Sequence, residues 1–161
     1  MLFRSQDLRT QTKKMERNTR IGETINFSQD GKGPITSYLN NHWYNRESWG
    51  IWSDGKNSDI LLPIPNGNPT KILFLFNALI SPSHPEQKLD ILINGHLEKS
   101  VTITSSSNNK VEVLLPENTD ENKLLKIEFQ TPNALSPKDA KISASDNRVL
   151  GIGLISAEFQ K

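Results

Sequence analysis

The sequence predicts an all-β protein, built as one antiparallel β-sandwich. Its 161 residues suit a single domain. Only 34% of them are hydrophobic, while Ser, Thr, Asn, Gly and Pro are abundant, which favours short strands joined by turns over a helical bundle. Apolar residues alternate with polar ones in several short segments, and helical periodicity is almost absent. We therefore expect about eight to ten strands, each with one face on a core and one toward solvent.

Four strands are expected in the first half of the chain. Residues 23–28 alternate, 48–53 form a short apolar segment, and 59–65 form a compact apolar run stopped by prolines. Residues 71–80 are apolar on both faces. A run of that kind predicts a central strand that is covered on both sides.

The clearest local signal is a β-hairpin over residues 88–104. Apolar residues alternate with polar ones on both sides of Asn94-Gly95. These two residue types readily adopt the positive φ angles of a two-residue type I′ turn. The segment therefore predicts two antiparallel strands joined at Asn94 and Gly95.

Three further strands are expected near the end of the chain. Residues 110–116 and 122–130 each place apolar side chains on one face, and 148–159 form a strand with small residues that permit close packing. Residues 131–147 lack a strand or helix pattern. A loop of that length is unusual in a compact domain, so we expect it to be functional or to cross between the sheets.

Charge divides the chain into a basic extension, residues 1–21, and a sandwich domain, residues 22–161. The first 20 residues hold six Lys or Arg and two Asp or Glu, and the remainder holds 13 and 16, so the net charges are +4 and −3. The extension fits a linker or helical lead-in, or an arm that touches nucleic acid or anionic lipid. Because the body is mildly acidic and the extension lacks interleaved aromatic residues, we expect no nucleic-acid partner.

Several site classes are disfavoured by what the sequence lacks. There is no cysteine, which excludes disulfides and thiolate metal sites and fits a reducing compartment. No apolar run has the length of a membrane span, and no zinc, phosphate-loop or nucleophile-elbow motif occurs. We expect no cofactor. A structural calcium ion remains an alternative, because Asp30, Asp139 and Asp146 lie in expected loops.

The aromatic segment 43–55 is the main candidate site. It contains all three tryptophans and one of the two tyrosines of the chain, among charged residues. If 49–53 is extended, Trp49 and Ile51 point to one side and Trp52 to the other. Sugar rings stack on aromatic rings through their C–H faces, and carboxylates bind their hydroxyls. We expect the ligand-binding residues to be Trp43, Tyr44, Trp52 and Asp54. The competing interpretation is that the tryptophans belong to the core.

The carboxylates give a weaker signal. Glycoside cleavage needs two carboxyl groups flanking one bond. Glu47, Asp54, Asp59 and Asp146 are candidates by residue type alone, since nothing in the sequence pairs them. Glu47 with Arg46 is equally consistent with ion pairs that hold the aromatic segment in place.

Short motifs at both ends of the body resemble a bacterial family of β-sandwich domains attached to glycosyltransferases and cell-envelope polysaccharide proteins. The first motif is Trp, Glu, then Trp-Gly-x-Trp-Ser, and an Asn-Gly hairpin follows. The last is Ser-Pro, then Asp-x-Arg-x-Leu-Gly. The matching residues here are Trp43, Glu47, Trp49, Trp52, Ser53, Asn94, Gly95, Ser136, Pro137, Asp146, Arg148, Leu150 and Gly151.

The resemblance spans residues 22–160 and implies a jelly-roll domain similar to carbohydrate-binding modules, without catalysis of its own. It implies a glycan or polysaccharide as ligand, a glycosyltransferase domain as partner, and a bacterial cytoplasmic or cell-envelope location. Motif residues can also be structural. Glu47, Trp49, Asp146 and Arg148 are then polar or structural partners, with Glu47 and Arg148 paired across the sandwich.

The sequence thus predicts a non-catalytic accessory domain that binds carbohydrate, linked to polysaccharide synthesis. The alternative is a structural or protein-interaction domain that positions a neighbouring enzyme. That alternative predicts burial of all three tryptophans. A small hydrolase would need two carboxylates in one cleft.

Overall fold

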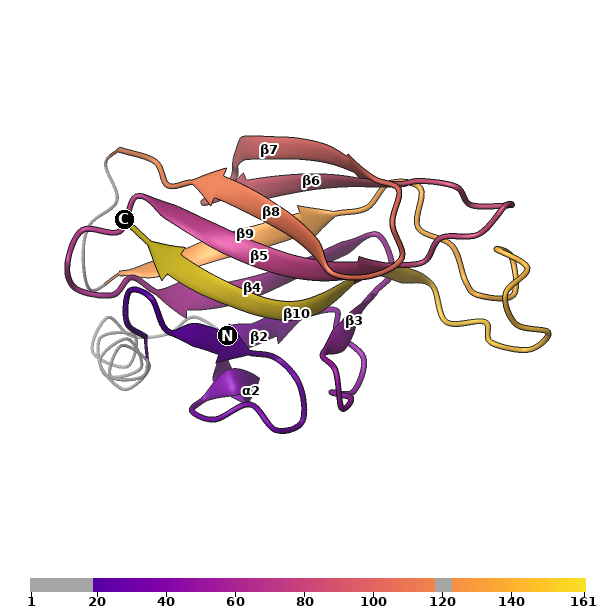
Figure 1. Cartoon of the computed structure of the whole chain (residues 1–161), viewed down its shortest axis with the longest axis horizontal. Coiled ribbons are helices and arrows are strands. Elements are labelled where there is room, and N and C mark those ends of the chain that lie inside the picture. The colour runs from indigo at the N-terminus through magenta and orange to yellow at the C-terminus, as the bar shows by residue number, and fades with distance from the viewer. Residues whose placement is uncertain (1–18, 118–122) are drawn as a thin grey trace, which may run out of the picture.

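The computed structural model describes residues 19–117 and 123–161 and contains two antiparallel β-sheets packed face to face (Figure 1). The antiparallel sandwich predicted from the sequence is confirmed. Ten strands and one helical turn are found in this part of the chain. The expected basic extension lies almost entirely outside the described residues.

The first sheet has the strand order β1-β10-β5-β8, and β3 also pairs with β10. Its strands are β1 (Thr24–Asn26), β3 (Ile51–Asp54), β5 (Lys71–Ala78), β8 (Asn109–Leu114) and β10 (Leu150–Gln160). Strand β10 has 11 residues, so it pairs with β1 along one part and with β3 along another while β5 lies on its other side. The last strand of the chain thereby holds β3 in this sheet.

The second sheet has the order β2-β4-β9-β6-β7. Its strands are β2 (Leu39–Asn41), β4 (Asn57–Pro63), β6 (Gln87–Ile93), β7 (His96–Ile103) and β9 (Leu124–Gln130). The helical turn α2 (Ile35–Tyr38) directly precedes β2. Neither α2 nor β2 was expected, because elements of four and three residues are too short to show a periodicity.

The core lies between the two sheets and follows the alternation of the strands. Phe74, Phe76 and Phe129 are fully buried and contact one another, with ring centroids 5.4 to 5.6 Å apart. Residues 71–80 differ from the expectation. Strand β5 is central in its sheet, but only one of its faces is buried, and Leu73 and Leu75 on the other are partly exposed, with no second layer over them among the described residues.

The hairpin between β6 and β7 is confirmed at the expected turn. Asn94 and Gly95 have φ angles of 50° and 85°, as a two-residue type I′ turn requires. The Asn94 side-chain oxygen also accepts a hydrogen bond of 3.0 Å from the backbone N–H of Lys126. The turn is thus fixed to the neighbouring strand β9.

The segment between β9 and β10, residues 131–149, contains no strand or helix, as expected, and projects from one end of the sandwich (Figure 1). Its base is held by buried side chains. Gln87 donates to the Asn133 side-chain oxygen (2.7 Å), and the His84 ring lies 3.1 Å from the Gln87 side-chain oxygen. Asn133 in turn donates to the carbonyl of Glu86 (2.9 Å). This network fixes the position from which the loop departs.

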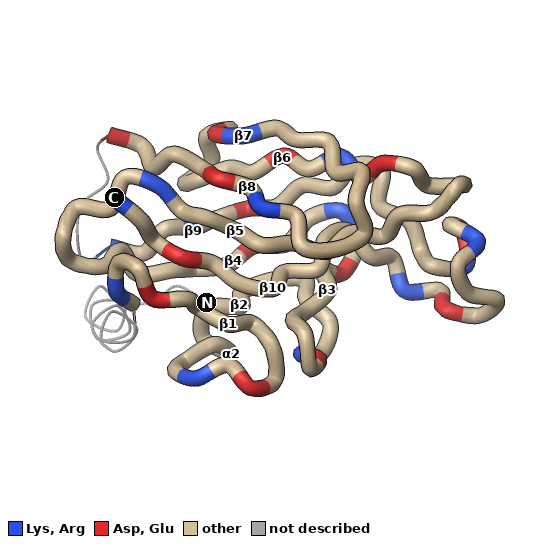
Figure 2. The backbone as a smooth tube through the Cα atoms, viewed as in Figure 1, with Lys and Arg blue, Asp and Glu red and all other residues tan. Residues whose placement is uncertain are grey.

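Charged residues are scattered over the described surface, and positive and negative groups are interspersed in the view of Figure 2. No helix in the described part of the chain is long and apolar enough to cross a membrane.

Candidate functional site

The four aromatic residues of segment 43–55 gather at one end of the sandwich, around β3. Trp43 forms a β-bridge with Ser53, and the backbone N–H of Tyr44 donates to the carbonyl of Trp52 at 3.0 Å. Residues directly opposite each other on paired antiparallel strands share a face. Tyr44 therefore lies beside Trp52, toward the outside, while Trp43 lies on the same side as the buried Ser53.

Trp43 is half-buried and held by two contacts with the sandwich. Its indole N–H donates to the carbonyl of Asp59 at 2.8 Å. Its ring meets the core residue Phe129 edge to face, at a centroid distance of 6.1 Å. These two contacts fix the orientation of the indole, because one restrains its N–H group and the other its ring.

Trp49 and Trp52 contact each other, contrary to the expectation that they face opposite ways. Their ring centroids are 5.1 Å apart at an angle of 71°. The expectation was wrong because β3 begins only at Ile51, after Gly50. A Cβ atom on Gly50 would lie 2.4 Å from the carbonyl oxygen of Leu154, so only glycine permits this approach.

Trp49 packs on the bare backbone of Gly153 in β10. A Cβ atom at Gly153 would lie 2.6 Å from the Trp49 ring, closer than real Cβ contacts occur. The glycine thus provides the surface on which Trp49 lies, and Trp49 supports Trp52 from one side.

Polar residues surround Tyr44. Its hydroxyl donates to the carbonyl of Val149 (3.4 Å), and the Arg148 guanidinium lies 5.5 Å from the centre of its ring. Burial, followed by a hydrogen bond with Asp54, raises the pKa of Tyr44. A hydrogen-bonded pair with Asp146 (2.8 Å at the shortest) raises the pKa of Arg148 and lowers that of Asp146.

Glu47 and Arg148 do not form the direct pair that was expected. Arg148 is instead paired with Asp146, two residues away in the same loop. One carboxylate oxygen of Glu47, Oε2, is buried and has no hydrogen-bond partner among the described residues. The charge of Glu47 nevertheless contributes to the raised pKa of Arg148, after the larger effect of Asp146.

Arg46 anchors the aromatic segment to the loop before α2. Its Nε donates to the carbonyl of Ser28 at 3.0 Å, its Nη2 donates to the same carbonyl, and Nη2 also reaches the carbonyl of Gly31 at 3.3 Å. The Gln29 side chain donates back to the carbonyl of Arg46 (3.0 Å). The guanidinium is therefore engaged with backbone oxygens.

A hollow of about 330 Å³ lies beside Trp43 and Tyr44. Its other lining residues are mostly polar and come from α2, β2, the loop that follows and the start of β3: Thr36, Leu39, Asn40, His42, Asn45, Arg46 and Ile51. Sequence reasoning did not single out Asn40 or Asn45. They stand in short irregular segments, where only their polarity could have marked them.

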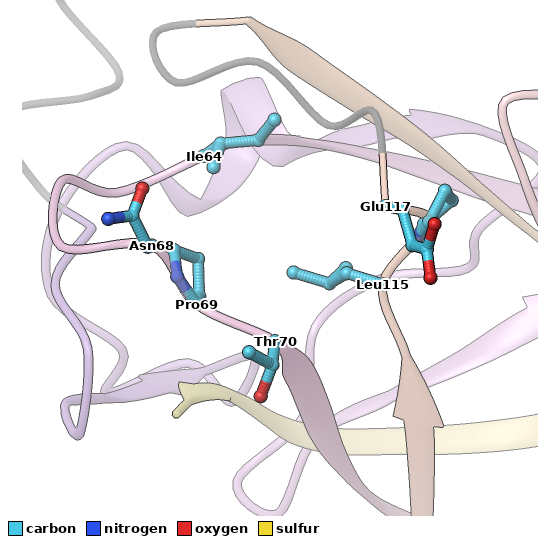
Figure 3. Close-up of a pocket in the computed structure, with 7 residues that line it drawn as sticks. Ile64, Asn68, Pro69, Thr70, Leu115 and Glu117 are labelled. Carbon is cyan, nitrogen blue, oxygen red and sulfur yellow. The ribbon is translucent and has the colours of Figure 1, made fainter.

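A second hollow of about 330 Å³ lies at the opposite end of the sandwich, between the β4–β5 turn and the end of β8 (Figure 3). Its lining mixes aliphatic side chains and prolines with polar groups: Ile64, Asn68, Pro69, Thr70, Leu115, Pro116 and Glu117. No aromatic side chain is found among the described residues that line it.

No group of three or more His, Asp or Glu residues that could hold a metal ion is found within residues 19–117 and 123–161. Asp30, Asp139 and Asp146, considered as calcium ligands from the sequence, do not come together as such a group there.

A family model described as "Domain of unknown function (DUF7024)" matches residues 11–161. The chain belongs to this family. The DUF7024 match begins inside the expected basic extension, 11 residues before the expected start of the sandwich domain at residue 22. No curated protein matches the chain.

Among solved structures, this DUF7024 chain is similar to carbohydrate-binding modules. The CBM36-1 domain of a multidomain xylanase from the hindgut metagenome of Trinervitermes trinervoides has 14% identity and a TM-score of 0.45, over 84% of this chain and 93% of that one. A family 35 module from an environmental isolate has 10% identity and a TM-score of 0.44 (89% and 82%). CsCBM6-3 from Clostridium stercorarium, solved with cellobiose, has 10% identity and a TM-score of 0.41 (86% and 93%). At scores this low, the similarity supports no conclusion about this chain's ligand.

Proposed function

We propose that this domain binds a glycan without catalysis, at the hollow beside Trp43 and Tyr44 and on the adjoining surface of Trp52. One observation supports this most strongly. Two partly exposed aromatic side chains, Trp43 and Tyr44, line a hollow that also carries amide and imidazole groups, and the partly exposed Trp52 lies beside Tyr44. Aromatic rings offer an apolar face to the C–H groups of a sugar, and amides match its hydroxyls.

The aromatic surface is organised before any ligand arrives. Trp43 is fixed by its bond to the Asp59 carbonyl and by Phe129. Trp52 is supported by Trp49. A ligand therefore does not need to order these side chains, and the entropic cost of binding is reduced.

Arg148 and Val149 hold Tyr44 from the loop side. The guanidinium lies over the phenol ring, and the carbonyl of Val149 accepts a hydrogen bond from its hydroxyl. Asp146 and the charge of Glu47 keep the guanidinium in place. In this proposal these residues position the tyrosine, and Asp54 also offers an exposed carboxylate to sugar hydroxyls.

Affinity for a single chain should be weak. A shallow polar surface exchanges hydrogen bonds with water for similar bonds with sugar, so the net gain per bond is about 0.5–1.5 kcal/mol. Attachment to a glycosyltransferase or another enzyme of bacterial polysaccharide synthesis, which the sequence motifs suggest, would raise the effective concentration.

The second candidate is a structural domain that positions a neighbouring enzyme. It is favoured by the inward packing of Trp43 and by the seat of Trp49 on Gly153. The two candidates differ at Trp52, whose indole remains partly exposed and makes no hydrogen bond among the described residues.

Calorimetric titration with neutral homo-oligosaccharides of glucose, xylose and mannose, read in parallel by tryptophan fluorescence, tests the proposal. We expect one series to bind, and Trp52→Ala to weaken that binding at least about tenfold, as for an aromatic hot spot. The matched control is Thr70→Ala, which removes a polar side chain from the opposite hollow.

Circular dichroism checks that both variants remain folded. If none of the neutral glycans binds to the parent protein, or if Trp52→Ala binds as well as the parent does, the structural candidate is the better description.

A further inference from the structure

The hollow beside Trp43 adjoins another one across His42. The same histidine lines a smaller hollow of about 170 Å³ on the outer side of the second sheet. Its other lining residues come from β2, β4 and β9: Asn41, Asn57, Ser58, Asp59, Lys126 and Glu128. The two hollows are therefore neighbours, because His42 lines both of them.

The backbone of His42 is held in an uncommon conformation. Its φ angle is 65°, in the left-handed region that few residues other than glycine occupy. Its carbonyl accepts a hydrogen bond from the N–H of Asp54 (2.8 Å). The pairing of β2 with β4 also shifts register between Leu39 and Asn41, directly before this residue. These features fix the backbone that carries the exposed imidazole between the hollows.

The floor of the smaller hollow is rigid. Asp59 is only 4% exposed, and both of its carboxylate oxygens accept hydrogen bonds, from the Asn40 side chain (2.8 Å) and the backbone N–H of Asn41 (3.0 Å). The neighbouring Asn57 is exposed, and no hydrogen bond of its side chain is found within the described residues. Its amide thus remains available to a ligand.

The cations that line the two hollows already have partners. Arg46 donates to backbone carbonyls, and the Lys126 ammonium lies 3.8 Å from the carboxylate of Glu128. Asp59 and Glu128 add negative charge on the same side as Lys126. An anionic sugar would thus meet paired cations and like charges, whereas an uncharged one would not.

We propose that the two hollows are adjacent subsites for one linear, uncharged glycan chain that passes across His42. This inference depends on the proposed function and extends it. The ligand is then a segment of more than two linked sugar rings, with one part on the aromatic surface and another against Asn57. A disaccharide would fill one subsite only.

Calorimetric titration along one neutral series, from the monosaccharide to the hexasaccharide, tests the inference on the full chain. We expect about tenfold tighter binding of the tetrasaccharide than of the disaccharide, because one to two added net hydrogen bonds correspond to that factor. A matching series of oligouronates should bind at least about tenfold more weakly than the neutral one.

Asn57→Ala should abolish the increase in affinity with chain length and leave disaccharide affinity unchanged. Lys126→Ala provides a second substitution in the same hollow. Thr70→Ala at the opposite end is the control that keeps the gain. Equal affinity at all lengths, equal losses for short and long chains in Asn57→Ala, or a preference for oligouronates would overturn this inference while leaving glycan binding intact. No binding at any length would overturn both proposals.

Discussion

The two ends of this sandwich carry hollows of the same size but of different chemistry. Strand β5 runs between them: Lys71 pairs with Leu114 near one, and Ala78 pairs with Ile152 near the other, roughly 23 Å apart. Each end has a hollow of about 330 Å³. The hollow at the β3 end is lined by two aromatic residues, Trp43 and Tyr44, whereas the residues that line the other are aliphatic, proline or polar (Figure 3).

What distinguishes the β3 end is the way its walls are secured. Trp43 donates to a β4 carbonyl, and Arg46 donates to the carbonyls of Ser28 and Gly31. A concavity becomes a plausible binding site when its groups are rigid and chemically matched to a ligand, and volume alone does not supply this. Substitutions at the β3 end test this difference.

The largest effect should come from Gly153→Ala. The new Cβ atom would lie 2.6 Å from the Trp49 ring and must displace it, so we expect about 2–3 kcal/mol of destabilisation, as for overpacking. The free energy of unfolding from urea denaturation measures this. Gly67→Ala at the opposite end, where φ is 102°, is the comparison and should cost about 1 kcal/mol. Equal losses of unfolding free energy at both ends would show that the packing of Trp49 on Gly153 makes no special contribution to stability.

Trp43→Phe should lower the free energy of unfolding by about 1–2 kcal/mol. The ring remains, but the carbonyl of Asp59 loses the donor at 2.8 Å. Trp52→Phe is the matched control, since no hydrogen bond of the Trp52 indole is found in the described part of the chain. A loss as large for Trp52→Phe would argue that ring size, and not the hydrogen bond, matters at Trp43.

Arg148→Lys should weaken glycan binding about threefold and change stability by less than about 0.5 kcal/mol, because surface ion pairs contribute little to folding. Lysine cannot reproduce both the paired contact with Asp146 and the planar contact over Tyr44. Titration of the responding oligosaccharide measures the change. Unaltered affinity would remove Arg148 from the support of Tyr44.

The smallest effect should be a dependence on acid pH. Hydrogen bonds from Arg148 lower the pKa of Asp146 below its ordinary value of 3.8. The pair's contribution is therefore complete above that value and is lost as pH falls through the lower pKa of the folded state. Glycan affinity should decline below about pH 4 in the parent protein. In Asp146→Asn, this decline should be absent, and a decline of the same size would assign it to another group.

The sequence was most informative where side chains alternate along long strands. Strands β5, β6 and β9 and the Asn94-Gly95 turn fall close to their expected positions, because burial of one face fixes both register and orientation. The covered outer face expected for β5 was wrong, since an apolar outer face does not itself provide a layer to cover it.

The site was only partly predictable. The density of aromatic residues marked segment 43–55, but it could not show that Gly50 turns Trp49 toward Trp52. The hollow residues Asn40, His42 and Asn45 lie in or beside elements of three or four residues, which carry no periodic signal. Arg148 was expected to pair with the distant Glu47, yet it binds Asp146, because a partner two residues away needs little chain ordering.

The tip of loop 131–149 is held to its base by several hydrogen bonds, among them those from the N–H of Lys138 to the carbonyl of Asp146 (2.9 Å) and from the N–H of Ile142 to the carbonyl of Pro137 (2.9 Å). Beyond them, Ala144 and Ser145 are exposed. Extra residues inserted there should be accommodated at an entropic cost that rises only slowly with length. The domain thus offers a position at which new recognition sequences could be installed next to Arg148 while the strands remain as they are.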